Sequence, residues 1–230
     1  MSLSKILARL ICIFEGKTIF CYSIRMLIIQ LLFENPLLYL MWAIAILFSF
    51  SVHEYAHAQA AYSLGDPTAK HYGRLSINPL AHFDPIGTLL IFIFGFGWGK
   101  PVPFNLYNLK NPRRDSAIIG FAGPLSNFLL ALLSGLMIRF FLLPKALYLF
   151  LGIFCWLNLI LGIFNLIPVP PLDGSHILLA FLPSSYQNLR LFLFQNSPIL
   201  LILGILFMWG IGFPKIAPFL FHLITNTYLF

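Results

Sequence analysis

Residues 36–64 read PLLYLMWAIAILFSFSVHEYAHAQAAYSL, an apolar run long enough to cross a bilayer as a single helix. Two histidines and a glutamate interrupt it: His53, Glu54 and His57. Ionisable side chains are costly inside a membrane-length apolar segment, and a functional site is the default interpretation of their presence there. The run therefore predicts a transmembrane helix that carries a site.

The spacing of these three residues indicates a particular chemistry. His53 and His57 are four residues apart, so on a helix they share one face, and two imidazoles one turn apart suit a tetrahedral zinc ion. Glu54 directly follows the first histidine, where a carboxylate can reach a metal-bound water and take its proton. The alternative is that these polar groups only hydrogen-bond a neighbouring helix, which explains neither the spacing nor the interposed glutamate.

The composition favours a membrane protein. Of the 230 residues, 60% are hydrophobic and 9% are charged, and the mean hydropathy is +0.90. A water-soluble domain of this length cannot bury so much apolar surface, so we expect one compact membrane domain in contact with the lipid bilayer. The net charge of +7 comes from Lys and Arg in the loops, as the positive-inside rule predicts for cytoplasmic loops. No basic stripe with interleaved aromatics occurs, so we expect no nucleic-acid partner.

Further apolar segments follow the first one. We expect spans over residues 36–64, 116–140, 146–167 and 191–213, with residues 216–230 as an apolar tail whose placement the sequence leaves open. The predicted fold class is therefore an all-α polytopic membrane protein with about four to six transmembrane helices. Its zinc site would lie within the membrane, near the cytoplasmic side.

The chain divides into three parts. Residues 1–35 form an N-terminal interfacial or hydrophobic segment, residues 36–182 a transmembrane core, and residues 183–230 a C-terminal hydrophobic region. Within the first part, residues 1–17 predict an amphipathic helix at the interface. Residues 18–33 either cross the membrane or lie at its surface.

One apolar segment, residues 86–96, is too short to span as a helix. Basic loops flank it on both sides, so both loops are expected on the cytoplasmic side, with a re-entrant element lining a cavity between them. Asn78, His82 and Asp84 precede the segment and are expected to cap and brace it through turn chemistry. The alternative for His71, His82 and Asp84 is a second metal site or a ligand to the first zinc, and for His176 it is a contact with the zinc site.

A third zinc ligand is expected from the later part of the chain. Pro168, Pro170 and Pro171 break a helix near the inner face and leave Asp173 on unwound backbone. Catalytic zinc takes three protein ligands and keeps a fourth position open. Asp173 is the best candidate because the chain has only seven acidic residues and this one can bend toward the histidines. A plain turn role before Gly174 is the alternative.

Three motifs in order carry a resemblance to a known family. They are HEYAH at 53–57, GPLSN at 123–127 and PVPPLDG at 168–174, with further matching stretches at 73–85 and 97–105. Together they resemble the site-2 protease family of intramembrane zinc metalloproteases, in the compact branch that lacks an inserted PDZ domain. The resemblance covers roughly residues 36–182.

The resemblance implies one zinc ion per chain, held by His53, His57 and Asp173, with Glu54 as general base and acid. It also implies that Asn127 lies near the active site and binds the substrate backbone or the oxyanion. A helix–helix hydrogen bond beside a small-residue packing notch at Gly123 is the alternative for Asn127.

Two classes of function remain for comparison. The first is a zinc metalloendopeptidase that hydrolyses transmembrane or membrane-embedded protein substrates, with its active site nearer the cytoplasmic face of the cell membrane. The second is a non-catalytic membrane protein that binds or transports metal with the same ligands. Glu54 favours the enzyme, and the chain lacks the paired broken helices in matching halves that a transporter would show. The sequence indicates neither the identity of the substrate nor the oligomeric state.

Overall fold

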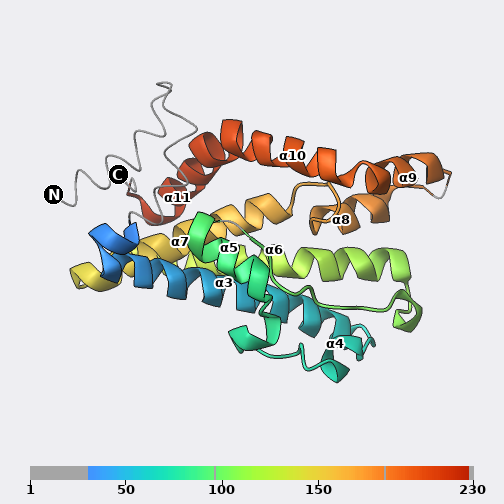
Figure 1. Ribbon diagram of the computed structural model, residues 1–230, viewed down its shortest axis with the longest axis horizontal. Helices are drawn as coiled ribbons and strands as arrows, with labels where there is room; N and C mark the ends of the chain where they lie inside the picture. The colour runs from blue at the N-terminus through green and yellow to red at the C-terminus, as the bar shows by residue number, and fades with distance from the viewer. Residues whose placement is uncertain (1–30, 96, 184, 228–230) are drawn as a thin grey trace.

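The computed structural model describes residues 31–95, 97–183 and 185–227, and the regular secondary structure in this part of the chain is helical throughout (Figure 1). The expected segment at 1–17 and nearly all of that at 18–33 lie outside the described residues. The elements are α3 (Pro36–Ser63), α4 (Thr68–His71), η1 (Pro79–His82), α5 (Pro85–Phe94), η2 (Leu106–Asn108), α6 (Pro112–Phe140), α7 (Lys145–Asn165), α8 (Gly174–Phe181), α9 (Gln187–Gln195), α10 (Ser197–Phe207), η3 (Met208–Ile216) and α11 (Ala217–Thr225).

Four stretches of the described chain are long and apolar enough to span a membrane: Pro36–Ser63, Pro112–Phe140, Lys145–Asn165 and Ser197–Thr225. The prediction of an all-α integral membrane protein is confirmed. The first three spans agree closely with the expected ranges.

The fourth span differs from the expectation. It was expected over residues 191–213 with a separate tail after it, but the structure begins it at Ser197 and continues it to Thr225. Pro214 lacks a backbone N–H and would ordinarily end a helix. Here it lies inside the nine-residue π-helix η3, whose altered hydrogen-bond pattern carries the chain onward into α11. The tail is therefore largely part of this span.

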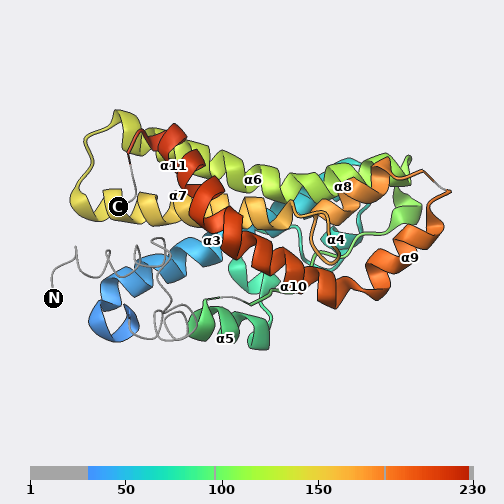
Figure 2. The same ribbon diagram turned by 90° about the horizontal axis from the view of Figure 1, so that it is seen from above.

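The centre of the molecule is a bundle in which α6 packs against both α3 and α7, with α8 laid on α6. Figure 2 shows the fourth span crossing α7 obliquely, and its α11 end packs onto α6 and α7. Ala131, Cys155, Leu159 and Phe221 form the buried apolar cluster at that contact. Three long helices are thus held in a fixed register around the segments that carry the motifs.

The short helix α5 runs along α3 and the chain then returns beside it. The Tyr39 hydroxyl of α3 donates to the Phe92 carbonyl near the end of α5 (3.1 Å). A Cβ added at Gly99, on the way back, would lie 2.2 Å from the Phe50 ring, and farther on the amide of Asn105 donates to Asp66 beyond the end of α3 (2.6 Å). The chain therefore enters and leaves along one helix, which is the course expected of a re-entrant element. Its location on the cytoplasmic side stays a prediction.

We call α5 and the stretch that returns beside α3 the hairpin. Local hydrogen bonds and a glycine fix the two ends of α5. Asp84 accepts the amide hydrogen of Gly87 (2.7 Å) at the start of α5, and Gly95 ends the helix in the left-handed conformation, with φ of 80°. One ring nitrogen of His82, Nε2, bonds to the Ser76 carbonyl oxygen (2.8 Å). The expected bracing role of His82 and Asp84 is confirmed by these contacts.

Candidate metal centre and active site

Three side chains from two distant parts of the sequence converge on one point. His53 and His57 project from α3, and Asp173 lies at the cap position directly before α8. The two Nε2 atoms are 3.0 Å apart, and Oδ2 of Asp173 lies 3.0 Å from Nε2 of His53 and 3.2 Å from Nε2 of His57. Ligand atoms of a tetrahedral zinc ion lie about 3.3 Å from one another. Within the described residues, His53, His57 and Asp173 form a group whose ligand atoms are close enough together to hold one metal ion.

The other nitrogen of each ring establishes which atoms face the centre. Nδ1 of His53 bonds to Oδ1 of Asn127 (2.6 Å), and Nδ1 of His57 bonds to the Ile119 carbonyl oxygen (2.7 Å). A carbonyl oxygen only accepts, so each Nδ1 carries a proton, and Nε2 is the nitrogen of each ring that faces the centre. In the neutral rings, both Nε2 atoms present a lone pair to a metal ion at the centre.

Oδ2 of Asp173 is buried and has no hydrogen-bond donor. With both histidines neutral, three lone pairs face one another, and this arrangement is repulsive unless a cation lies between them. Two imidazole nitrogens and one carboxylate oxygen are the donor set of catalytic zinc sites, which leave one position open. The residues present therefore fit zinc.

Two glycines of α6 allow the centre to close. A Cβ added at Gly123 would lie 2.3 Å from Nε2 of His57, and one added at Gly120 would lie 2.9 Å from the Asp173 carbonyl oxygen. Residues three apart share a face of a helix, so this glycine face of α6 supports both parts of the ligand set. The sequence reasoning noted a notch at Gly123 and missed Gly120, although the G-x-x-G spacing was the available signal.

The backbone before Asp173 folds back onto the end of α7. That helix ends at Asn165, as the proline-rich stretch after it predicts. A Cβ at Gly174 would lie 2.3 Å from the Leu166 carbonyl oxygen, so only glycine allows the chain to pass there. This close passage returns Asp173 to the level of the histidines.

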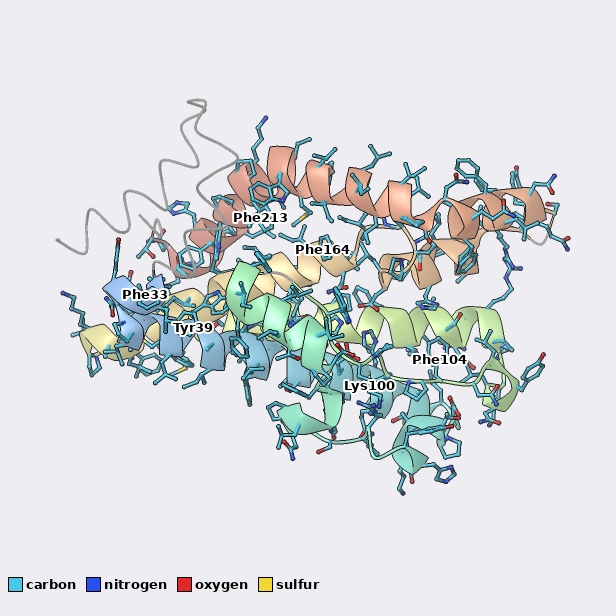
Figure 3. The ribbon with its side chains drawn as sticks, viewed as in Figure 1. Phe33, Tyr39, Lys100, Phe104, Phe164 and Phe213 are labelled. Atoms are coloured by element: carbon cyan, nitrogen blue, oxygen red, sulfur yellow. The ribbon has the colours of Figure 1, made fainter. Side chains whose placement is uncertain are left out.

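Glu54 is buried beside this centre and is absent from the group of converging ligand atoms. Its Oε2 accepts the backbone N–H of Val102 (3.3 Å). Figure 3 shows Lys100 and Phe104 of the same extended stretch beside α3 and α6. The returning arm of the hairpin therefore lies over the carboxylate.

The structure brings Asn127 to the centre but buries it completely. Besides the bond to His53, its Nδ2 donates to Oδ1 of Asn158 on α7 (2.8 Å). The helix–helix hydrogen bond, one of the two interpretations left open, is therefore observed, and contact with substrate stays a prediction. Asn158 was missed by the sequence reasoning. Its signal was a lone amide within an apolar span.

Three further histidines for which the sequence left a role at a metal site open lie outside the metal-binding group. His71 is exposed on α4, and His82 bonds to Ser76 as described. The ring of His176 packs edge-on against Phe104, with the ring centroids 5.4 Å apart. None of the three belongs to the group of converging ligands.

Comparisons with known proteins identify the family. Residues 141–209, which include Asp173, match the profile of peptidase family M50. A protein named "Putative zinc metalloprotease YwhC" from Bacillus subtilis is 44% identical over 154 residues, which cover 61% of this chain and 68% of that protein. The chain belongs to peptidase family M50. As an M50 peptidase it is a zinc metalloprotease and a site-2 protease relative, as the motifs indicated.

Two further relatives of this M50 peptidase carry similar names. "Putative zinc metalloprotease MJ0611" from Methanocaldococcus jannaschii is 29% identical over 172 residues, or 72% of this chain and 85% of that protein. "Putative zinc metalloprotease Rip2" from Mycolicibacterium smegmatis is 31% identical over 135 residues, or 56% of this chain and 52% of that protein. No solved structure matches the chain.

Proposed function

We propose that this M50 peptidase hydrolyses peptide bonds of transmembrane or membrane-embedded protein segments. Zinc is held by His53, His57 and Asp173, and Glu54 is the general base. The observation that carries the proposal is the convergence of two histidine nitrogens from a membrane-length helix and one oxygen of Asp173, beside the buried carboxylate of Glu54. The relatives named as zinc metalloproteases support the reaction class.

The roles follow from the positions of the groups. Zinc, when bound, polarises the scissile carbonyl and lowers the pKa of the water at its open position. Glu54 then accepts the proton of the attacking water and passes it to the amine that leaves. Its place directly after His53 turns it off the face that the two histidines share, so its carboxylate is free for this task.

The depth of the site supports a substrate within the bilayer. Ser63 ends α3, and at 1.5 Å per residue His53 lies about 15 Å and His57 about 9 Å before that end. A peptide bond must therefore enter the apolar layer to reach the zinc.

The charge distribution supports a site near the cytoplasmic face. Lysines and arginines lie around the end of α3 that is nearer the site and around the start of α6: Lys70, Lys110, Arg113 and Arg114. Clusters of this kind mark cytoplasmic loops. The opposite end of the helices carries fewer basic residues, Arg139 and Lys145. Water would reach the site from the more polar, basic end.

The experiment compares membrane fractions of cells that express the wild-type protein with cells that express Glu54→Gln. Glutamine keeps the size of the side chain and removes the base, so zinc content should be unchanged and turnover should fall at least ~10²-fold. Substrate segments should then accumulate as intact transmembrane peptides in quantitative proteomics. Equal peptide profiles in the two strains would contradict the protease proposal and favour a non-catalytic metal-binding protein.

A further inference from the structure

A polar cluster lies at the centre of the bundle, outside the ligand set. We call Ser49, Asn127 and Asn158 the three-helix cluster, because they come from α3, α6 and α7 in that order. All three residues are fully buried. Buried amides and hydroxyls among apolar membrane helices are costly unless every donor and acceptor is paired. Such a cluster therefore calls for a specific explanation.

Every polar atom of the cluster has a partner. The Nδ2 group of Asn158 donates one hydrogen to the Phe154 carbonyl oxygen and one to Oγ of Ser49, both at 2.8 Å. The Nδ2 group of Asn127 donates to Oδ1 of Asn158 (2.8 Å) and to the backbone carbonyl of Ser49 (3.3 Å). The Ser49 hydroxyl donates to the Ala45 carbonyl oxygen (2.7 Å).

Backbone carbonyls fix the orientation of both amides. The Phe154 carbonyl only accepts, so the amino group of Asn158 faces it and Oδ1 of Asn158 faces Asn127. Asn127 must then turn its own amino group toward Asn158, a direction that the Ser49 carbonyl also requires. A flip of either amide would bring two acceptors or two donors face to face.

The fixed orientation of the Asn127 amide determines which ring nitrogen of His53 carries a proton. With its amino group engaged, Asn127 can present only Oδ1 to Nδ1 of His53 (2.6 Å). Nδ1 must carry a proton, so in the neutral ring the lone pair is on Nε2, which faces Asp173. His57 is oriented separately, because its Nδ1 bonds to a backbone carbonyl that no substitution of a side chain removes.

We propose that Asn158 is a positioning residue for the metal centre: through Asn127 it holds His53 in the tautomer and ring orientation that present Nε2 to the zinc. The side chain of Asn158 has no hydrogen bond to His53, and we propose that it acts through Asn127. The inference rests on the proposed role of His53 as a ligand. Partners of metal-ligating histidines typically change metal affinity 10- to 100-fold when they are lost.

The test measures zinc dissociation constants of the purified full chain in detergent, by competition with a chromophoric chelator. Asn158→Leu removes both amide functions with an apolar side chain that suits a membrane helix, and it should weaken zinc binding about 10- to 100-fold. The visible spectrum of the Co²⁺-loaded variant should also differ from that of the wild type, because the geometry at His53 has changed. Cys155→Ala, one turn away in the fully buried part of α7, is the matched control and should leave the zinc affinity unchanged.

A double-mutant cycle separates positioning from packing. In an Asn127→Ala background, Asn158→Leu should cause no further loss of zinc affinity, because the hydrogen bond between Asn127 and His53, through which Asn158 is proposed to act, is already absent. An equal loss in both backgrounds, or wild-type affinity in Asn158→Leu alone, would overturn the proposal. If Asn158→Leu does not fold, Ser49→Ala replaces it in the same double-mutant cycle. This substitution removes the hydroxyl oxygen that accepts a hydrogen bond from the Asn158 amino group.

A further variant distinguishes this inference from the proposed function on which it rests. His53→Ala should lose zinc binding outright. If His53→Ala kept wild-type zinc affinity, the ligand set itself would be wrong. Loss of zinc in His53→Ala together with no effect of Asn158→Leu would refute the positioning role alone.

Discussion

The Cα of Gly123 faces Nε2 of His57 so closely that a methyl group there would lie 2.3 Å from the nitrogen. This nitrogen is also 3.2 Å from Oδ2 of Asp173. The side-chain position of Gly123 therefore points at the space where we propose the metal. Helix α6 therefore packs directly against the proposed metal centre. A side chain at position 123 would occupy that space, so glycine is required there for the metal to bind.

Gly123→Ala should abolish zinc binding in a protein that still inserts as a helical bundle. Alanine favours the helix but its methyl group would displace the histidine rings, because rigid backbone lies behind it. Gly152→Ala on α7 is the matched control, since a Cβ there meets nothing within 4 Å. Zinc content by elemental analysis should be near zero in the first variant and normal in the second. Normal zinc in Gly123→Ala would contradict this geometry.

Asp173→Ala should lose most of its bound zinc. Oδ2 of Asp173 is the only carboxylate oxygen among the converging atoms, and two neutral imidazoles alone hold the ion far more weakly than a site with three ligands. The same elemental analysis checks this result, with Asp84→Ala as a control that removes the N-terminal cap of α5, a carboxylate outside the ligand group. Full zinc occupancy in Asp173→Ala would remove this residue from the ligand set.

Asp66 anchors the returning arm of the hairpin that covers Glu54. Its two oxygens accept four hydrogen bonds, from the backbone and hydroxyl of Thr68, the backbone of Asn105 and the side chain of Asn108. Asp66→Asn offers one acceptor oxygen in place of two, so the arm should loosen. Amide hydrogen exchange of residues 100–109 should become faster, whereas Asp84→Asn should leave it unchanged, because asparagine caps helices as well as aspartate does.

The same anchor predicts a pH dependence. Burial raises the pKa of Asp66, but the hydrogen bonds from Thr68, Asn108 and Asn105 outweigh it and hold the pKa below its usual value. A lowered pKa means that the stabilisation is complete above the unfolded value, about 3.9, and is lost as the pH falls through the folded value. Limited proteolysis within residues 100–109 should therefore be slow at neutral and mildly acidic pH and accelerate only below about pH 4. Acceleration near pH 6 would contradict this role of Asp66.

Membrane sidedness can be tested with single cysteines at two exposed positions. Tyr107 lies on the hairpin side of the molecule and is 96% exposed, and Leu142 lies in the turn between α6 and α7 and is fully exposed. Tyr107→Cys should react with a membrane-impermeant maleimide only from the cytoplasmic side, and Leu142→Cys only from the opposite side. Labelling of both from one side would refute the proposed topology, and reversed labelling would place the active site near the outer face.

The sequence by itself determined the parts of this protein that depend on local spacing. The turn of a helix fixes the separation of His53 and His57, so their shared face follows from four residues of sequence. The proline-rich stretch before Asp173 stops a helix in any context, so the break in the helix before this residue was predictable, whereas the short helix α8 after it was not expected. Apolar length identified three of the four spans. The fourth was misjudged because a π-helix, which the sequence pattern does not announce, carries the chain past Pro214.

Only the tertiary structure decided which groups meet. His53 and Asn127 are 74 residues apart, and Asn158 and Ser49 are 109 apart. An apolar pattern shows that a segment is a buried helix, but the rotation and register of one helix against another depend on the packing of all of them together. The glycine face of α6 sets how closely α3 and α8 approach. That approach, which no local stretch encodes, places Asp173 beside the histidines and the amide of Asn127 behind one of them.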